Sequence, residues 1–194
     1  MDKAKVAIIT FGDYRKNEWE KVFKNLTEPR HKKAIENLQK LDVEVLYNEE
    51  VSRTRAQITE AVDNLKRQGA QIFIAHTPCW TSPNLAVYGV QRMNLPTIVL
   101  GNRDAATHGN VGFFGTSGSL GQIGYPHKRV RIDYDSPDLG EKVMPYIRAA
   151  QVRSQLQGSV FGYFGGRSIG IDTAQFDAMQ WRKKFGVDAE HIDQ

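Results

Sequence analysis

The chain has 194 residues, of which 40% are hydrophobic and 25% charged, the composition of a globular rather than a disordered protein. Lys and Arg number 26 against 22 Asp and Glu, and this net charge of +4 gives no basis for a nucleic-acid-binding function. A single cysteine, Cys79, excludes an internal disulfide framework, and no run approaches the roughly 18 apolar residues of a membrane span, so we expect a cytoplasmic protein without membrane partners.

The first part of the chain alternates short apolar runs with helical patterns. A β-branched run at 5–10 predicts a buried parallel strand, which Gly12 and Asp13 end. Apolar residues at 19, 22, 23 and 26 predict a helix that Pro29 interrupts, with a second helical segment at 35–41. Further strands are predicted at 43–47, 71–75 and 97–100, with a helix at 58–65 ended by Gly69. This alternation predicts an α/β fold with a doubly wound parallel sheet of the Rossmann or flavodoxin type.

The densest basic cluster is the run from Arg30 to Lys33, which Glu36 follows. We interpret this cluster as a solvated helix face.

Six glycines recur every third residue from Gly109 to Gly124. The span is too short and too poor in proline for collagen, so we expect a loop followed by a glycine-tolerant helix packed closely on its neighbours. The run 128–132 predicts another strand. Ser136 and Pro137 then suit the cap and the first position of a helix.

A second unit is predicted to begin at Gly158. It consists of a strand at 159–164, a Gly165-Gly166 turn, a helix ended by Gly186, and a strand at 187–193. The apolar stripe of that helix is Ile171, Ala174, Ala178, Trp181 and Phe185. We therefore predict a first α/β domain at 1–157 and an incomplete second one at 158–194. The alternative is that the second unit completes the first sheet.

Two loops are expected at the carboxyl edge of the parallel sheet, where ligands bind in open α/β folds. The segment 76–83 follows the third strand and presents Trp80, which either stacks on a sugar ring or packs over the sheet end as a lid. The segment 11–16 follows the first strand. It carries Arg15, either a ligand donor or a solvated side chain, and Asp13, which could cap the next helix.

Other candidate sites are weak. The loop 165–170 resembles a phosphate cradle at a helix start, but it lacks the spacing of a nucleotide motif, so tight packing is the alternative. The five histidines are scattered, and no set of metal ligands is predicted. His76 and Cys79 lack an orienting partner, so they do not form a nucleophile pair.

The segments 75–80, 165–171 and 185–193 together resemble the L-fucose isomerase family, the first through its T-P-C-W loop. The resemblance implies a metal-dependent aldose–ketose isomerase of L-fucose, D-arabinose or a related sugar, with Mn²⁺ or another divalent cation, assembled as a homo-oligomer such as a trimer or hexamer. It also implies that the metal ligands and catalytic carboxylates lie beyond this chain. The chain would then hold no catalytic or metal residue, be inactive alone, and contribute Trp80 and Arg15 to a neighbouring subunit's active site.

The sequence departs from the family pattern at two places. Ile169 stands where the family turn commonly has methionine, and Thr81-Ser82-Pro83 follows the tryptophan, which leaves the sugar preference open. Two alternatives remain at this point. One is a stand-alone sugar-binding or regulatory module, and the other is a nucleotide-binding domain unrelated to sugars.

Overall fold

The computed structural model describes residues 2–103, 106–133, 135–166, 169–173 and 175–193. The chain divides into two compact units, residues 1–148 and 149–194, and the helix α6 (Leu139–Leu156) crosses from one to the other. The domain boundary predicted at 157–158 stays a prediction.

Five parallel strands form the sheet of the first unit, in the order β2-β1-β3-β4-β5. Their bounds are Ala4–Thr10 (β1), Val43–Tyr47 (β2), Ile72–Thr77 (β3), Thr97–Asn102 (β4) and His127–Ile132 (β5). Val6 of β1 lies opposite Val45 of β2 on one side and Ile72 of β3 on the other. The predicted parallel α/β sheet is confirmed, and its strand order is that of the flavodoxin-like doubly wound fold.

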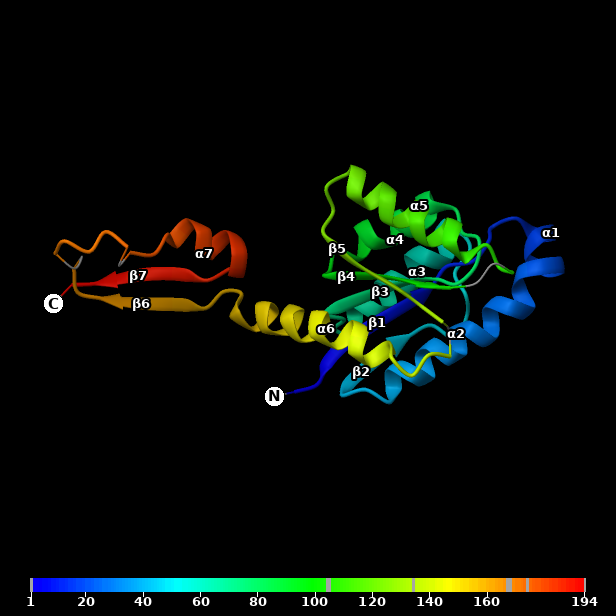
Figure 1. The fold of residues 1–194 in the computed structure, drawn as a ribbon, viewed down its shortest axis with the longest axis horizontal. Helices are drawn as coiled ribbons and strands as arrows, with labels where there is room; N and C mark the ends of the chain where they lie inside the picture. Colours follow the sequence, from blue (N-terminus) through cyan, green and yellow to red (C-terminus); the bar gives the residue numbers. More distant parts are fainter. Residues whose placement is uncertain (1, 104–105, 134, 167–168, 174, 194) are drawn as a thin grey trace. The chain divides into compact units, whose positions relative to one another are not determined.

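Helices cover both faces of this sheet (Figure 1). One face carries α3 (Arg55–Arg67), α4 (Pro83–Met93) and α5 (Gly109–Gln122), and the other carries α2 (Lys24–Gln39). Ala7, Ile9 and Phe73 share a core with α3, α4 and α5, and the strand residues between them point to the opposite layer. Because β1 is covered on both sides, its apolar run is continuous rather than alternating.

Three consecutive helical segments lead without a break onto the sheet face that α2 covers. α1 (Lys16–Glu18) leads into the π-helix η1 (Trp19–Phe23), and α2 continues across Pro29. The predicted interruption at Pro29 is therefore wrong. Thr27 and Ala34, on either side of the proline, are both buried, so packing outweighs the single hydrogen bond that proline removes.

The basic cluster at 30–33 is not a solvated face. Arg30 and His31 are buried, whereas Lys32 is exposed and Lys33 half-buried. An α-helix has about 3.6 residues per turn, so four consecutive residues point in every direction, inward included. The interpretation from sequence is wrong for its first two residues.

The glycine-rich segment is helical from its first residue. α5 begins at Gly109, so the loop expected at the start of this segment is wrong. The expected close packing is confirmed for Gly109, Gly112 and Gly115, where an added Cβ would come within 3 Å of a neighbouring atom.

Two other helices differ from the sequence predictions. α4 has no counterpart among them, although Ser82 before Pro83 is a common pattern for a helix start. α6 begins at Leu139, after the predicted cap at Ser136. The Ser136 hydroxyl accepts a hydrogen bond from the Asp138 amide at 3.2 Å, in a turn that precedes the helix.

The second unit has its own sheet, of two parallel strands, β6 (Val160–Phe164) and β7 (Asp188–Ile192), with α7 (Ala178–Phe185) between them in sequence. It does not complete the first sheet. The predicted helical stripe is wrong at Ile171, which precedes α7, and Ala174 lies outside the described residues. The ring of Phe161 lies 5.6 Å from Phe176 and 5.1 Å from Trp181, which gives this unit a small aromatic cluster.

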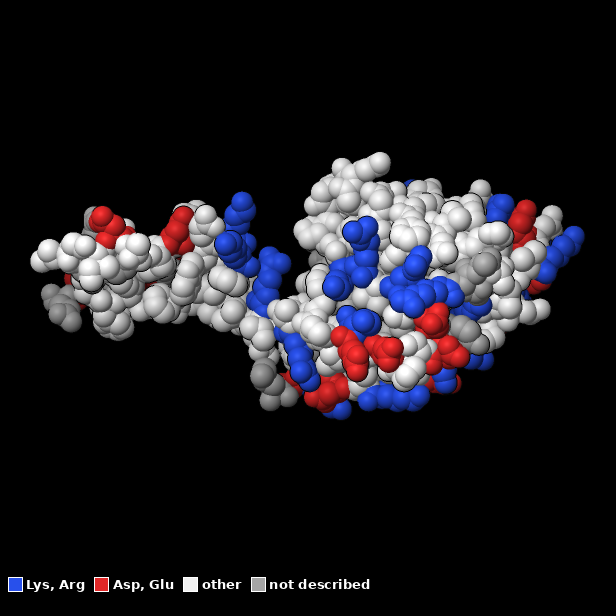
Figure 2. All heavy atoms as spheres, viewed as in Figure 1, with Lys and Arg blue, Asp and Glu red and all other residues white. Residues whose placement is uncertain are grey.

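Charges of both signs lie side by side on the face of the first unit shown in Figure 2. Exposed pairs include Lys3 with Asp42 at 3.5 Å and Lys5 with Glu44 at 3.6 Å. Such pairs keep a surface polar and contribute little to stability.

Candidate functional site

The order in which strands are added to the sheet changes direction between β1 and β3, although all five strands run parallel. The chain passes from β1 to β2 on one side, then crosses to β3 on the other. Ligands bind at such a switch point in open α/β sheets, beyond the carboxyl ends of the strands. Thr10 at the end of β1 pairs with His76 near the end of β3, so the loops that follow, 11–15 and 78–82, start side by side.

The structure brings the two predicted site residues together. The guanidinium carbon of Arg15, from the first loop, lies 4.2 Å from the centre of the Trp80 ring, from the second. A cation over an indole face is attracted by the electron density of the ring. The pair forms one continuous surface at the switch point.

Asp13 fixes the guanidinium in this position. Nε of Arg15 donates to Oδ1 of Asp13 at 3.0 Å, and Nη2 donates to Oδ2 at 2.6 Å. Oδ1 also accepts the Arg15 backbone amide at 3.0 Å. These bonds raise the pKa of Arg15, chiefly through the hydrogen bond to Asp13. Asp13 therefore positions Arg15 and does not cap α1, which has no side-chain cap.

Trp80 is half-buried and rests on an apolar cluster. That cluster consists of Trp19, Phe23, Val51 and Cys79. Trp80 packs on this cluster and its ring remains partly accessible, so the choice between a lid and a ligand contact stays a prediction.

Arg30 and Thr107 fix the backbone of the loop 78–82 through hydrogen bonds. Nη1 of Arg30 donates to the Pro78 carbonyl at 3.2 Å and to the Thr107 hydroxyl at 2.7 Å. The Thr107 carbonyl accepts the Trp80 amide at 2.7 Å. A buried guanidinium thus fixes the backbone on both sides of Cys79.

The glycine face of α5 packs against the same loop. A Cβ added at Gly109 would lie 2.9 Å from the Pro78 oxygen, and one at Gly112 would lie 2.7 Å from the Cys79 oxygen. At Gly115 it would lie 2.6 Å from Cγ of Pro83. Because these glycines recur every third residue, they form one side of α5 that lacks side chains, and the loop that carries Trp80 packs against that side.

A buried row of polar side chains runs beneath the two loops, and sequence reasoning missed it. Nε2 of His76 lies 3.2 Å from Oδ1 of Asn102, and its Nδ1 lies 2.9 Å from the Thr10 hydroxyl. The same hydroxyl lies 2.8 Å from Nδ1 of His31. The row joins β4, β3, β1 and α2 at the carboxyl edge of the sheet. The only signal in the sequence is a polar residue at or near the end of each of these three strands.

Burial disfavours the charged form of both histidines in this row. Burial lowers the pKa of His76 to about 3, despite the opposing hydrogen bond to Asn102. Burial also lowers the pKa of His31, against the effect of the Glu49 and Asn48 backbone. A neutral imidazole has one donor and one acceptor, so each ring can take part in a directed chain of hydrogen bonds.

Cys79 has separate partners from His76. Its thiol donates to the Trp80 carbonyl at 3.3 Å, and burial raises its pKa. A thiol that stays protonated is a poor nucleophile. Cys79 is therefore a packing residue beneath Trp80.

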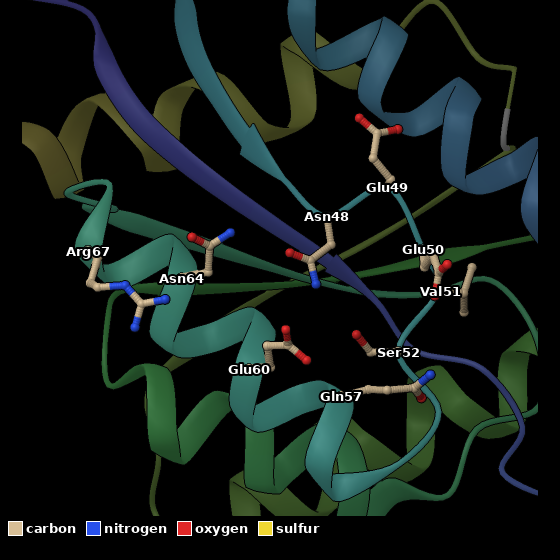
Figure 3. A pocket seen from close by; sticks show the side chains of 9 residues that line it. All are labelled: Asn48, Glu49, Glu50, Val51, Ser52, Gln57, Glu60, Asn64 and Arg67. Carbon is tan, nitrogen blue, oxygen red and sulfur yellow. The ribbon is translucent and has the colours of Figure 1, made fainter.

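A polar pocket of about 460 Å³ lies between the loop 48–52 and α3. Figure 3 shows Asn48, Ser52 and Glu60 directed toward one another across it, while Glu49 points to the other side of the loop, toward α2. The loop after β2 therefore has a polar wall on each side.

The sequence was compared with models of known protein families. A family model described as L-fucose isomerase, first N-terminal domain, matches residues 3–158. The chain belongs to the L-fucose isomerase family. The matched range includes Arg15, Trp80 and the whole five-stranded sheet. A search of curated proteins gives no match.

The residues at the switch point do not fit the divalent metal that an L-fucose isomerase is expected to use. Among the described residues, no three His, Cys, Asp or Glu side chains are grouped so that they could hold a metal ion. Asp13 is bound to Arg15, and both nitrogens of His76 are hydrogen-bonded. We therefore assign no metal step to these residues.

Two further findings bear on the predictions. Arg167 and Ser168 of the loop 165–170 lie outside the described residues. In the part of the chain that the structure describes, no helix combines the length and the apolar character needed to cross a membrane.

Proposed function

We propose that this chain forms the first domain of a metal-dependent aldose–ketose isomerase of the L-fucose isomerase type, with L-fucose, D-arabinose or a related monosaccharide as substrate. The contact between Arg15 and Trp80 at the switch point carries the proposal. Both residues lie within the range that the family model matches.

In this proposal the pair forms one wall of a sugar pocket. The accessible part of the Trp80 ring is an apolar surface for the C–H groups of a sugar. Arg15 binds Asp13 through Nε and Nη2, so the hydrogens of Nη1 are available to sugar hydroxyls beside Glu18, whose carboxylate lies 3.8 Å away. Because Asp13 already orders the guanidinium, binding costs little side-chain entropy.

The proposal places the chemistry elsewhere in the enzyme. Moving a proton between adjacent carbons requires a positioned base and a polarised carbonyl. We assign the base and the Mn²⁺, or another divalent cation, to other domains, and the completed pocket to a junction with a neighbouring subunit of a cytoplasmic homo-oligomer, a trimer or hexamer. The chain alone is then inactive, and neither nucleic acid nor membrane is a partner.

A stand-alone sugar-binding module is the second candidate. The first unit buries a continuous core of its own and contains both Arg15 and Trp80, which favours binding without any other domain. Such a module would bind a monosaccharide as an isolated chain.

The test uses the chain alone and the chain joined to the catalytic domains of an L-fucose isomerase. We expect no Mn²⁺-dependent isomerisation by the chain alone and turnover of L-fucose or D-arabinose by the joined protein. In the joined protein, Trp80→Ala removes stacking worth about 1–3 kcal/mol, seen mainly in KM. Phe114→Ala, an exposed aromatic change on α5, is the matched control.

Three outcomes decide between the candidates. Turnover by the chain alone would overturn the assignment of the base and the metal to other domains. An unchanged kcat/KM in Trp80→Ala would reduce Trp80 to a lid. Saturable sugar binding by the chain alone, with no turnover in the joined protein, would favour the stand-alone module.

A further inference from the structure

The buried polar row ends at a nitrogen that lacks a hydrogen bond of normal geometry. His31 is 2% exposed, and its Nδ1 contacts the Thr10 hydroxyl at 2.8 Å. Its Nε2 is fully buried and makes no hydrogen bond of normal geometry among the described residues, although the Asn48 and Glu49 backbone lies near the ring. Buried polar atoms in native proteins nearly always have a partner, so an exception calls for an explanation.

His31 lines a second pocket, of about 360 Å³, on the α2 side of the loop after β2. This is the side toward which Glu49 points in Figure 3. One wall comes from η1 and α2, and the other from the residues after β2. The pocket volume falls within the range of small-ligand sites.

The charges that line this pocket nearly balance. Four carboxylates face three cations, and the set consists of Glu20, Glu28, Glu49 and Glu50 with Lys24, Lys32 and Arg53. The four carboxylates would repel a polyanion. A divalent cation would lack a ligand set, since no described group of three such side chains could hold a metal ion. The lining therefore suits a neutral ligand.

The hydrogen-bonding requirement at His31 narrows the ligand further. The row from Asn102 to His31 can run in either direction, because the Asn102 amide can present its oxygen or its nitrogen. Nε2 of His31 is an acceptor in one direction and a donor in the other. A hydroxyl satisfies both, whereas an ammonium ion only donates and a carboxylate only accepts.

We propose that this pocket binds a small neutral molecule with several hydroxyl groups, one of which pairs with Nε2 of His31. The remaining hydroxyls alternate between carboxylate acceptors and the donors of Lys24 and Arg53. Arg53 is held in place by its position over the Trp19 ring, at 4.8 Å. The site uses neither Arg15 nor Trp80, and it does not rest on the proposed isomerase function.

The experiment titrates the ¹⁵N-labelled chain with ribitol, an acyclic polyol without a carbonyl group, and follows the histidine ring nitrogens by NMR. We expect the Nε2 resonance of His31 to shift and saturate, while the exposed His191 of the second unit stays unchanged. His31→Gln should weaken binding roughly tenfold, the loss of about one hydrogen bond.

Two further variants keep the test decisive if His31→Gln does not fold. Glu50→Ala removes one carboxylate from the exposed loop and should weaken ribitol binding several-fold, whereas Trp80→Ala should leave it intact. The absence of a His31 shift up to the solubility limit of ribitol would overturn the site. A saturating shift with ammonium or phosphate but not with ribitol would overturn the choice of a neutral ligand.

Discussion

The guanidinium of Arg15 lies over the ring of Trp80 at 4.2 Å while two of its nitrogens bind the carboxylate of Asp13. The Asp13 side chain is fully buried, and that of Arg15 is 38% exposed. The arginine therefore connects a buried charge to the accessible surface of the site.

Arg15→Ala should lower the unfolding midpoint in urea, because it leaves the buried Asp13 carboxylate without its guanidinium. Arg15→Lys should recover only part of the loss, since an ammonium group cannot form the forked contact. Arg92→Ala is the matched control, because Arg92 makes the same forked contact to Asp63 on the surface and should cost little. Equal losses at both sites would contradict the role given to Asp13.

Gly112→Ala should destabilise the chain by about 1–3 kcal/mol, because the new methyl group would lie 2.7 Å from the Cys79 oxygen and push the loop away. Gly118→Ala, in the same helix, meets no atom within 4 Å and should stabilise by about 0.5–1 kcal/mol through helix propensity. Urea unfolding of both variants measures the difference. Effects of the same sign would refute the packing of α5 on the loop.

Acid should destabilise the first unit through His76. Its native pKa of about 3 lies below the unfolded value of about 6.5, so the unfolded chain binds a proton that the native chain does not. The unfolding free energy should fall by about 1.4 kcal/mol per pH unit between about pH 6.5 and about pH 3. His31, whose pKa is also lowered, adds a loss in the same direction.

Urea titrations at pH 7, 6 and 5 test this expectation. His76→Gln should flatten the dependence, whereas His191→Gln, at an exposed histidine, should not. A slope that His76→Gln leaves unchanged would assign the acid sensitivity to other groups.

Backbone amides of β6 and β7 should exchange with deuterium faster than those of β1 and β3, on the order of a hundredfold or more. Val187 is buried, but every residue of β6 and β7 is exposed or half-exposed, so a two-stranded sheet protects them weakly. Hydrogen exchange followed by mass spectrometry measures both units in one sample. Comparable protection would show that the second unit is covered in solution.

The strands were predictable because their burial appears in the residue types. The run from Val6 to Thr10 is β-branched apart from Ala7, as befits a strand with helices on both sides. The same logic placed Trp80 and Arg15 at one edge of the sheet, because loops that follow neighbouring parallel strands meet there. Their mutual contact follows from topology, whereas their role in binding stays a proposal.

The polar interior was not predictable from the residue types. Arg30 and His31 belong to a run that looks solvated, and only the fold shows that Arg30 bonds to Pro78 and Thr107 and that His31 contacts Thr10 at the end of β1. Hydrogen-bond partners such as Thr10 and Asn102 are far from His76 in sequence and carry no local pattern. Which buried polar groups bond to one another is therefore known only from the folded structure.

Because α5 packs against the loop 78–83, some positions of this loop tolerate substitution better than others. At Pro78 and Cys79 the main chain itself packs against Gly109 and Gly112, so the path of the backbone there depends on residues far along the chain, whatever side chains the loop carries. Trp80 projects from this anchored backbone and can be exchanged without moving it. Evolution or design could therefore retune the aromatic wall by single substitutions at 80, while insertions into the loop would require compensating changes along α5.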